Sequence, residues 1–443
     1  MTTVAQRLGP VLESVFSGEA PLRLRAWDGS ETGPAAAPVV VLHSRRALRR
    51  LLWQPGELGV AEAYIAGDLD VEGDLAEGLG RVLHAVRERP AGPAARPFPL
   101  PRIAGLRPAE AARAAGVALR LGVLGPRPAA PGAPRARLRG KPHSTARDRA
   151  AISHHYDLSN DWYAALLDPS MAYSCGYWTA PEDDPAYGLA DAQRDKLELI
   201  CRKLALAPAG RLLDVGCGWG SLALHAAVEH RVHVTAITLS REQHDFVAAR
   251  VRERGLTELV QVRLGHYRDL DASGGTGYDA VSAVEMGEHV GEPDYPGFAS
   301  RLHRLLRPRG RLLVQQMSRD STAPGGGAFI EAYIAPDMHM RPVGATVGML
   351  ESAGLEVRSV ESLREHYVRT IRAWLRTLED DWPRFTVLAG EPTARLWRLY
   401  LAGAALAFAE RRMGVDQILA VRTAEDGGSG MPATPSSWYG ERP

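Results

Sequence analysis

Cysteine is scarce in this sequence, which has three in 443 residues: Cys175, Cys201 and Cys217. They lie far apart along the chain and none has the close spacing of a metal-ligand motif, so the sequence predicts no metal site. Disulfide frameworks are typical of oxidising compartments. The low cysteine content therefore favours a reducing, cytoplasmic location.

Long apolar runs are missing as well. The sequence has no stretch of about eighteen uncharged apolar residues, which argues against a membrane-spanning helix. The first thirty residues contain acidic side chains and no long apolar core, so we expect no signal peptide. Any membrane contact is expected to be peripheral, at the inner face.

Charge of one sign is not in excess, because 53 Lys and Arg residues face 52 Asp and Glu residues, a net charge of +1. The whole chain therefore offers no broad attraction to nucleic acid, and we expect no nucleic-acid partner. The length predicts two to three domains.

Basic charge is nevertheless concentrated between residues 96 and 147, where eleven Lys or Arg side chains stand against one acid, Glu110, among clustered prolines. This composition is typical of a linker, although residues 109–124 have helical spacing. A solvated linker, a segment attracted to anionic lipid headgroups and a basic arm for nucleic acid all fit it. Aromatic interleaving, which favours the last, is limited to Phe98.

We expect four parts in chain order. Residues 1–92 form a small accessory or lipid-binding α/β domain, with a strand at 39–44 and a helix at 45–54. Residues 93–150 are the basic linker, residues 151–423 the catalytic domain and residues 424–443 a flexible tail rich in Gly, Pro and Ser.

The central motif is RLLDVGCGWGS at residues 211–221. Two apolar residues and Asp214 end a predicted buried strand, and three glycines then allow a tight turn into a helix. A strand, a glycine-rich turn and a helix amino terminus form a nucleotide-type site at the carboxyl edge of a parallel sheet. The G-x-G-x-G spacing differs from the dinucleotide fingerprint, and the missing Lys-Ser/Thr pair excludes a P-loop.

Strand and helix patterns alternate around this motif, with further strands predicted at 232–240, 260–265, 278–286 and 311–317. The alternation predicts an α/β fold with a doubly wound, mostly parallel, Rossmann-like sheet. Residues 321–343 are expected to form a lid or a substrate-facing insertion. The apolar helix at 394–415 fits either a buried core helix or the wall of an acyl-chain channel.

Six segments, HYDLSNDWY, MAYSCGYW, LLDVGCGWGSLA, ITLSREQ, EHVG and HYVRTIRAW, occur here in the order found in cyclopropane fatty acid synthases. The chain resembles this family over residues 152–421. The resemblance implies a class I S-adenosylmethionine-dependent methyltransferase fold, S-adenosylmethionine as cofactor, and methyl transfer to a double bond in a phospholipid acyl chain at the membrane surface.

The resemblance also implies which residues contact the cofactor. The glycine turn and Asp214 approach the methionine and ribose portion, Thr238 and Gln243 take the place of the usual ribose-binding acid, and Tyr267 flanks the adenine or is a surface tyrosine. The cofactor-binding set expected is Tyr173, Ser174, Asp214, Gly216, Cys217, Gly218, Gly220, Thr238, Gln243 and Tyr267.

Positive charge develops on the substrate in this reaction, so carboxylates and aromatic faces suit the site. Glu288, Tyr367 and Cys175 match family active-site positions, and Glu285 adds a second acid to the same segment. Glu288 as a capping or ion-pairing residue and Cys175 as a small buried filler are the structural alternatives.

One departure concerns the product. The family holds a bicarbonate with a Glu, a Cys, a Tyr and a His, but Gln315 stands where that His belongs. A glutamine cannot carry positive charge, so a bound bicarbonate is doubtful and a hydride shift with proton loss becomes the expected exit for the cation. In this respect the chain is most similar to the methyltransferase subunit of actinobacterial 10-methyl fatty acid synthases, which converts oleoyl to 10-methylene stearoyl chains for a flavin-dependent reductase partner. A true cyclopropane synthase is the alternative.

Two other classes remain: a methyltransferase for RNA or polar metabolites, and a lipid-binding protein with a vestigial cofactor fold. The HYDLSNDWY and YSCGYW segments argue against the first, and release of adenosylhomocysteine would exclude the second. A homo-oligomer is compatible with the sequence, which leaves the oligomeric state open.

Overall fold

The chain divides into two units whose segments interleave along the sequence, in a computed structural model that describes residues 2–16, 18–87, 108–136, 138–141, 143–144, 147–151, 158–270, 277–320 and 327–439. The first unit comprises Met1–Ala136, Gly326–Ile334 and Leu378–Leu406, and the second comprises the remainder. The sequence instead predicted four parts that follow one another along the chain, so the interleaving was not expected. Residues 152–157, which include the first three residues of HYDLSNDWY, and residues 93–107 of the predicted linker lie outside the described residues.

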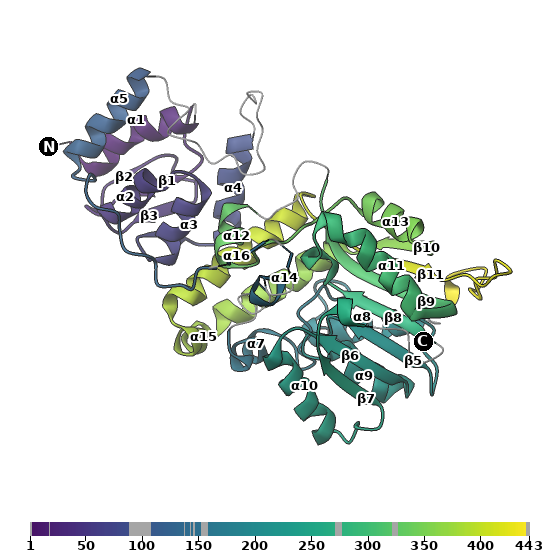
Figure 1. Ribbon diagram of the computed structural model, residues 1–443. Helices are drawn as coiled ribbons and strands as arrows, with labels where there is room; N and C mark the ends of the chain where they lie inside the picture. The colour runs from purple at the N-terminus through teal and green to yellow at the C-terminus, as the bar shows by residue number, and fades with distance from the viewer. Residues whose placement is uncertain are drawn as a thin grey trace. The chain divides into compact units, whose positions relative to one another are not determined.

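A four-stranded sheet in the order β2-β1-β3-β4 lies at the centre of the first unit (Figure 1). Only the β1–β3 pair is parallel among these strands. The predicted strand and helix are β3 and α2, and α2 starts where the Ser44 side chain accepts a hydrogen bond from the backbone N–H of Arg46. The elements are α1 (Val4–Phe16), β1 (Arg23–Arg25), β2 (Glu31–Thr32), β3 (Val39–Leu42), α2 (Arg45–Trp53), α3 (Glu57–Ile65), β4 (Leu69–Glu72), α4 (Leu75–Arg87) and α5 (Pro108–Arg120).

Later parts of the chain complete this first unit: α12 (Ala328–Tyr333), α15 (Trp382–Ala389) and most of α16 (Glu391–Ala409). The buried Arg395 of α16 donates hydrogen bonds to the backbone oxygens of Tyr64 and Leu69. Tyr333 of α12 donates to the carboxylate of Glu62. These long-range polar contacts explain why sequence order does not separate the units.

A seven-stranded sheet in the order β10-β11-β9-β8-β5-β6-β7 forms the second unit (Figure 1). The five strands from β7 to β9 are parallel, and at the other end β11 pairs antiparallel with both β9 and β10. This confirms the predicted doubly wound, mostly parallel sheet. Its strands are β5 (Arg211–Val215), β6 (His233–Thr238), β7 (Val260–Leu264), β8 (Tyr278–Val284), β9 (Leu306–Ser318), β10 (Glu356–Ser362) and β11 (Gly414–Val421).

Helices cover both faces of this sheet, because successive strand residues alternate between two apolar cores. Leu212 packs with α8, α9 and α10, whereas the next residue, Leu213, packs with α11 and α13. The helices of the unit are α7 (Asn160–Leu166), α8 (Leu189–Lys203), α9 (Ser221–His230), α10 (Arg241–Glu253), α11 (Tyr295–Leu305), α13 (Val343–Ser352), α14 (Arg364–Asp380, as far as Thr377) and α17 (Ser436–Tyr439).

Two carboxyl-terminal segments differ from the sequence expectations. The apolar helix predicted to reach Val415 ends at Ala409, and β11 begins at Gly414. The predicted tail contains α17, whose Trp438 is buried. Among the helices of the described residues, none combines the length and the apolar character needed to cross a bilayer.

Candidate active site

The glycine turn between β5 and α9 has the predicted conformation. Gly216, Gly218 and Gly220 have φ values of 78°, 55° and 82°, in the left-handed region that favours glycine. A Cβ on Gly216 would lie 2.8 Å from the Met286 side chain. The turn therefore needs glycine both for its backbone and for the space beside it.

A cavity lies next to this turn at the carboxyl edge of the parallel strands, where nucleotide-type ligands bind in such sheets. It has a volume of about 790 Å³, including its open mouth. The predicted site residues that line it are Gly216, Gly218, Thr238, Gln243, Tyr267 and Glu285.

Polar groups on one wall of the cavity suit a neutral, hydroxyl-bearing ligand. The Thr238 hydroxyl donates a 2.8 Å hydrogen bond to Oε1 of Gln243. The buried Nε2 of Gln243 has no hydrogen-bond partner within the described part of the chain. A buried donor without a partner is unfavourable, so this amide is available to a ligand oxygen.

Tyr267 closes the cavity beside this wall and is 8% exposed. Its ring lies 4.4 Å from the His266 ring and meets Phe298 edge-on. The tyrosine is therefore a buried cavity residue, and the alternative of a surface tyrosine is not what the structure shows.

Asp214 and Cys217 are buried and do not line the cavity. Asp214 accepts a 2.8 Å hydrogen bond from Ser282, and burial raises the pKa of its carboxyl to about 6. Burial likewise raises the pKa of the Cys217 thiol well above its usual value.

The segment carrying Tyr173, Ser174 and Cys175 is held by α8. Lys196 is fully buried and donates a 2.8 Å hydrogen bond to the Ser174 hydroxyl, and Gln193 donates to the Ser174 backbone oxygen. Burial lowers the pKa of Lys196, while the charge of Glu285 opposes that shift. The Tyr173 ring packs against Tyr163 and Trp374.

Four of the predicted catalytic residues meet at one carboxylate, that of Glu285. Its Oε1 accepts hydrogen bonds from the backbone N–H of Cys175 at 2.8 Å and from Nε2 of Gln315 at 2.9 Å. Its Oε2 accepts one from the Tyr367 hydroxyl at 2.6 Å. Burial raises the pKa of Glu285, opposed by these hydrogen bonds. Glu285 has a φ of 50°, a conformation that side chains rarely adopt outside over-determined sites.

Gln315 continues this cluster into the sheet, because β9 and β11 pair Gln315 with Gln417. Nε2 of Gln417 donates to Oε1 of Gln315 at 2.9 Å, and Nζ of the buried Lys203 donates to Oε1 of Gln417 at 2.7 Å. Lys203 also forms an ion pair with Glu361. A row of hydrogen bonds thus runs from Lys203 to Glu285.

Glu288 lies outside the cluster around Glu285 and does not line the cavity. Its carboxylate is fully buried, accepts a hydrogen bond from the backbone N–H of Met317, and has no described partner for Oε2. Burial, and then the charge of Glu285, raise the pKa of Glu288 to about 8. The structure therefore places Glu285, rather than Glu288, beside the other predicted catalytic side chains.

The thiol of Cys175 is buried and contacts the backbone oxygens of Gly176 and Leu363. Burial and the neighbouring Glu285 raise the pKa of this thiol well above its usual value, so it is neutral. What Cys175 offers Glu285 is its backbone N–H.

Sequence reasoning missed the groups that hold these residues in place. Lys196 and Lys203 lie on the buried face of α8. A lysine at a position where the helical pattern requires an apolar residue is the sequence feature that could have identified them. The cavity is also lined by Asp148, His266 and Asp337, which lie outside the six family segments, and by His289 of the EHVG segment, which was not among the predicted site residues.

The mycolic acid cyclopropane synthetase family model matches residues 143–418. The chain is 36% identical to the probable fatty acid methyltransferase Rv3720 of Mycobacterium tuberculosis, over 99% of this chain and 100% of the relative. It is 31% identical to the tuberculostearic acid methyltransferase UfaA1 of the same organism, over 91% and 88% of the two chains. The structure resembles mycolic acid cyclopropane synthase CmaA1 complexed with SAH and CTAB, with a TM-score of 0.56, 28% identity, and coverage of 63% and 98%. The chain, with its class I methyltransferase fold, belongs to the mycolic acid cyclopropane synthetase family.

Proposed function

We propose that this protein transfers a methyl group from S-adenosylmethionine to the double bond of an oleoyl chain in a phospholipid and releases a 10-methylene stearoyl chain. The coarser activity follows from family membership: the chain is an S-adenosylmethionine-dependent enzyme that modifies lipid acyl chains. The substrate and the methylene product are the proposal.

The cavity suits S-adenosylmethionine on its own chemistry. Positive-φ glycines let a ligand approach the backbone closely, and the free Nε2 of Gln243 and the Thr238 hydroxyl suit ribose hydroxyls. Tyr267 offers a ring for the adenine. When bound, this cofactor supplies an electrophilic methyl group on a sulfonium.

The reaction requires a group that tolerates positive charge. The electron pair of the double bond attacks the methyl carbon, the carbon–sulfur bond breaks, and a cation forms on the adjacent chain carbon. A hydride shift from the methylated carbon moves the charge there, and loss of a proton from the added methyl group leaves a methylene branch. The Glu285 carboxylate lines the cavity, which supports a role for it in stabilising the cation and accepting this proton.

The observation that carries the methylene product is the hydrogen bond from Gln315 to Glu285. An amide at this position cannot become a cation, so it binds an anion such as bicarbonate less firmly than a histidine does. Rapid removal of a proton from the added methyl group would close a cyclopropane ring. Where bicarbonate is bound less firmly, this proton is removed more slowly and the hydride shift occurs first.

The substrate is expected at the membrane surface, with the enzyme as a peripheral protein on the cytoplasmic face. The basic composition of residues 96–147 supports this, because each basic side chain near an anionic surface contributes about 1 kcal/mol of attraction. A flavin-dependent reductase partner would then saturate the methylene group.

The test is product analysis. Purified protein is incubated with S-adenosylmethionine and vesicles of dioleoyl phosphatidylglycerol, and the fatty acid methyl esters are identified by mass spectrometry. We expect 10-methylene stearate and one adenosylhomocysteine per product. A cyclopropane acid as the main product would overturn the proposal in favour of the second candidate, a cyclopropane synthase, which the names of several similar proteins support.

A further inference from the structure

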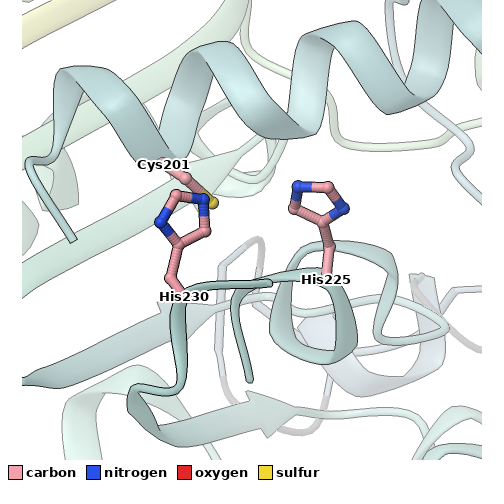
Figure 2. Close-up of side chains that lie close together, drawn as sticks. All are labelled: Cys201, His225 and His230. Carbon is pink, nitrogen blue, oxygen red and sulfur yellow. The ribbon is translucent and has the colours of Figure 1, made fainter. Parts of the chain in front are cut away.

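A cluster of metal-ligating side chains lies away from the cavity, between α8 and α9. The ligand atoms of Cys201, His225 and His230 lie within 4.8 Å of one another (Figure 2). Cys201 comes from α8, and the two histidines come from α9, His230 being its last residue. The cysteine and the two histidines lie on different helices, so the spacing of the cysteines alone did not reveal the cluster.

Glu198 adds a fourth donor to this cluster. It stands one helical turn before Cys201, on the same face of α8. Its Oε2 lies 3.3 Å from Nε2 of His225 and 2.9 Å from Nε2 of His230. Its other oxygen accepts a hydrogen bond from Arg202. One carboxylate oxygen thus faces both imidazoles.

We propose that Glu198, Cys201, His225 and His230 bind a structural Zn²⁺ ion in a tetrahedral site. Two nitrogen or oxygen ligands at about 2.05 Å from zinc lie roughly 3.3 Å apart in a tetrahedron. The Glu198–His225 distance of 3.3 Å matches this geometry, and the Glu198–His230 distance of 2.9 Å would have to lengthen by about 0.4 Å. A sulfur at about 2.3 Å would lie about 3.6 Å from each nitrogen, which small side-chain rotations supply.

Charge balance supports a divalent ion. A Glu198 carboxylate, a Cys201 thiolate and two neutral imidazoles carry two negative charges in total. Zinc binding displaces the thiol proton to solvent and forms the zinc–sulfur bond, so no oxidant or reductant is needed. The mixed sulfur and nitrogen donors favour zinc over the hard cations that prefer oxygen.

Burial and access fit a structural role. Cys201 is fully buried, whereas the side chains of His225, His230 and Glu198 are 14%, 19% and 28% exposed and leave a path for the ion. The ion would join the helix that carries Lys196 to the helix that begins at the glycine turn. It would therefore stabilise the packing of these two helices, neither of which contributes a lining residue to the cavity.

Cobalt titration tests the site with a spectroscopic readout. The full-length protein is stripped with a chelator, kept reduced and titrated with Co²⁺. We expect one equivalent to bind with the visible bands of tetrahedral cobalt and a thiolate-to-cobalt charge-transfer band, and Zn²⁺ to displace it. Zinc should also raise Tm in the wild-type protein, because it binds only the folded state.

Variants separate the site from general metal binding. C201S should lose the charge-transfer band, and H230Q should lower cobalt affinity at least about tenfold. His244 is a matched control, because it also contacts a carboxylate, Asp245, and lies outside the cluster, so H244A should keep the wild-type spectrum. Cobalt binding without a thiolate band in the wild-type protein, or an unchanged band in C201S, would overturn the proposal and leave a histidine–glutamate hydrogen-bond cluster. Should C201S fail to fold, the wild-type spectrum and H230Q decide the question.

Discussion

The side-chain amide of Gln315 donates a 2.9 Å hydrogen bond to the Glu285 carboxylate, at the position where the family resemblance places a histidine. This pair joins the sheet to the cavity wall, and the proposed product depends on it. Replacing Gln315 therefore tests the chemistry most directly.

Q315H should shift the product towards cyclopropane. An imidazole can accept from Gln417 with one nitrogen and donate to Glu285 with the other, and it can also become a cation that holds bicarbonate. We expect the ratio of cyclopropane to methylene product to rise at least about tenfold, a change of about 1.4 kcal/mol in relative barrier. Mass spectrometry of both products with and without bicarbonate measures it, and an unchanged ratio would show that Gln315 does not set the outcome. Q261H, on β7, is the control.

E285Q should lower kcat by about 10²–10³-fold, the loss typical of removing one group that stabilises transition-state charge. The dissociation constant for S-adenosylmethionine should change less than about threefold. Because burial raises the pKa of Glu285 and the carboxylate must be ionised, wild-type activity should fall with decreasing pH at a higher pH than for an ordinary glutamate. A parallel loss of cofactor affinity would argue for a binding role instead.

E288Q tests the other acid through stability. Burial raises the pKa of Glu288 to about 8, so between the unfolded value of 4.5 and about 8 the folded state binds the extra proton. Stability from this group therefore decreases as pH rises through that window, by up to about 1.4 kcal/mol per pH unit. We expect urea unfolding at pH 5, 6.5 and 8 to show a shallower decrease for E288Q than for the wild type. The exposed E258Q should keep the wild-type slope, and a steeper slope in E288Q would contradict the interpretation.

K196M removes the buried donor to Ser174. It should lower the free energy of unfolding by about 1–3 kcal/mol, because the Ser174 hydroxyl loses its partner and Glu285 loses a nearby cation. R194M, an exposed position on the same helix, should change stability by less than about 0.5 kcal/mol. Equal losses of unfolding free energy in the two variants would show that Lys196 has no special role in stabilising the site.

G216A should weaken cofactor binding by more than the cost of placing an alanine in the left-handed backbone conformation. Both Gly216 and Gly255 have positive φ, but only at Gly216 would a Cβ meet a side chain, that of Met286 at 2.8 Å, beside the cavity. G255A therefore measures the cost of the left-handed conformation, about 1 kcal/mol. We expect calorimetry to show a cofactor affinity at least tenfold lower for G216A than for G255A.

The parallel strands and the glycine turn were predictable because local patterns determine them. Apolar runs of strand length alternate along the chain with segments whose apolar residues have helical spacing. Gly216 marks a backbone conformation that few other residues adopt. The family resemblance also predicted that Cys175, Gln315 and Tyr367 belong to one site, although it could not distinguish the roles of two acids three residues apart.

Long-range pairing determined what the sequence did not reveal. Gln417 meets Gln315 only because β11 is antiparallel to β9 in a particular register. Glu285 joins the cluster with a positive φ, a backbone conformation that no local pattern signals for a glutamate. The interleaving of the two units likewise rests on contacts such as that of Arg395 with Tyr64, more than 300 positions away.

The hydrogen bonds between Lys203 and Glu285 all have the same donor-to-acceptor direction, from the lysine towards the carboxylate. An ammonium has no lone pair, so it obliges the Gln417 carbonyl to face it, and the NH₂ of Gln417 must then point at the Gln315 carbonyl. That orientation leaves Gln315 able to present only its own NH₂ to the carboxylate. A lysine three links away thereby sets the polarity felt at the reacting centre, and these positions are expected to change together in evolution.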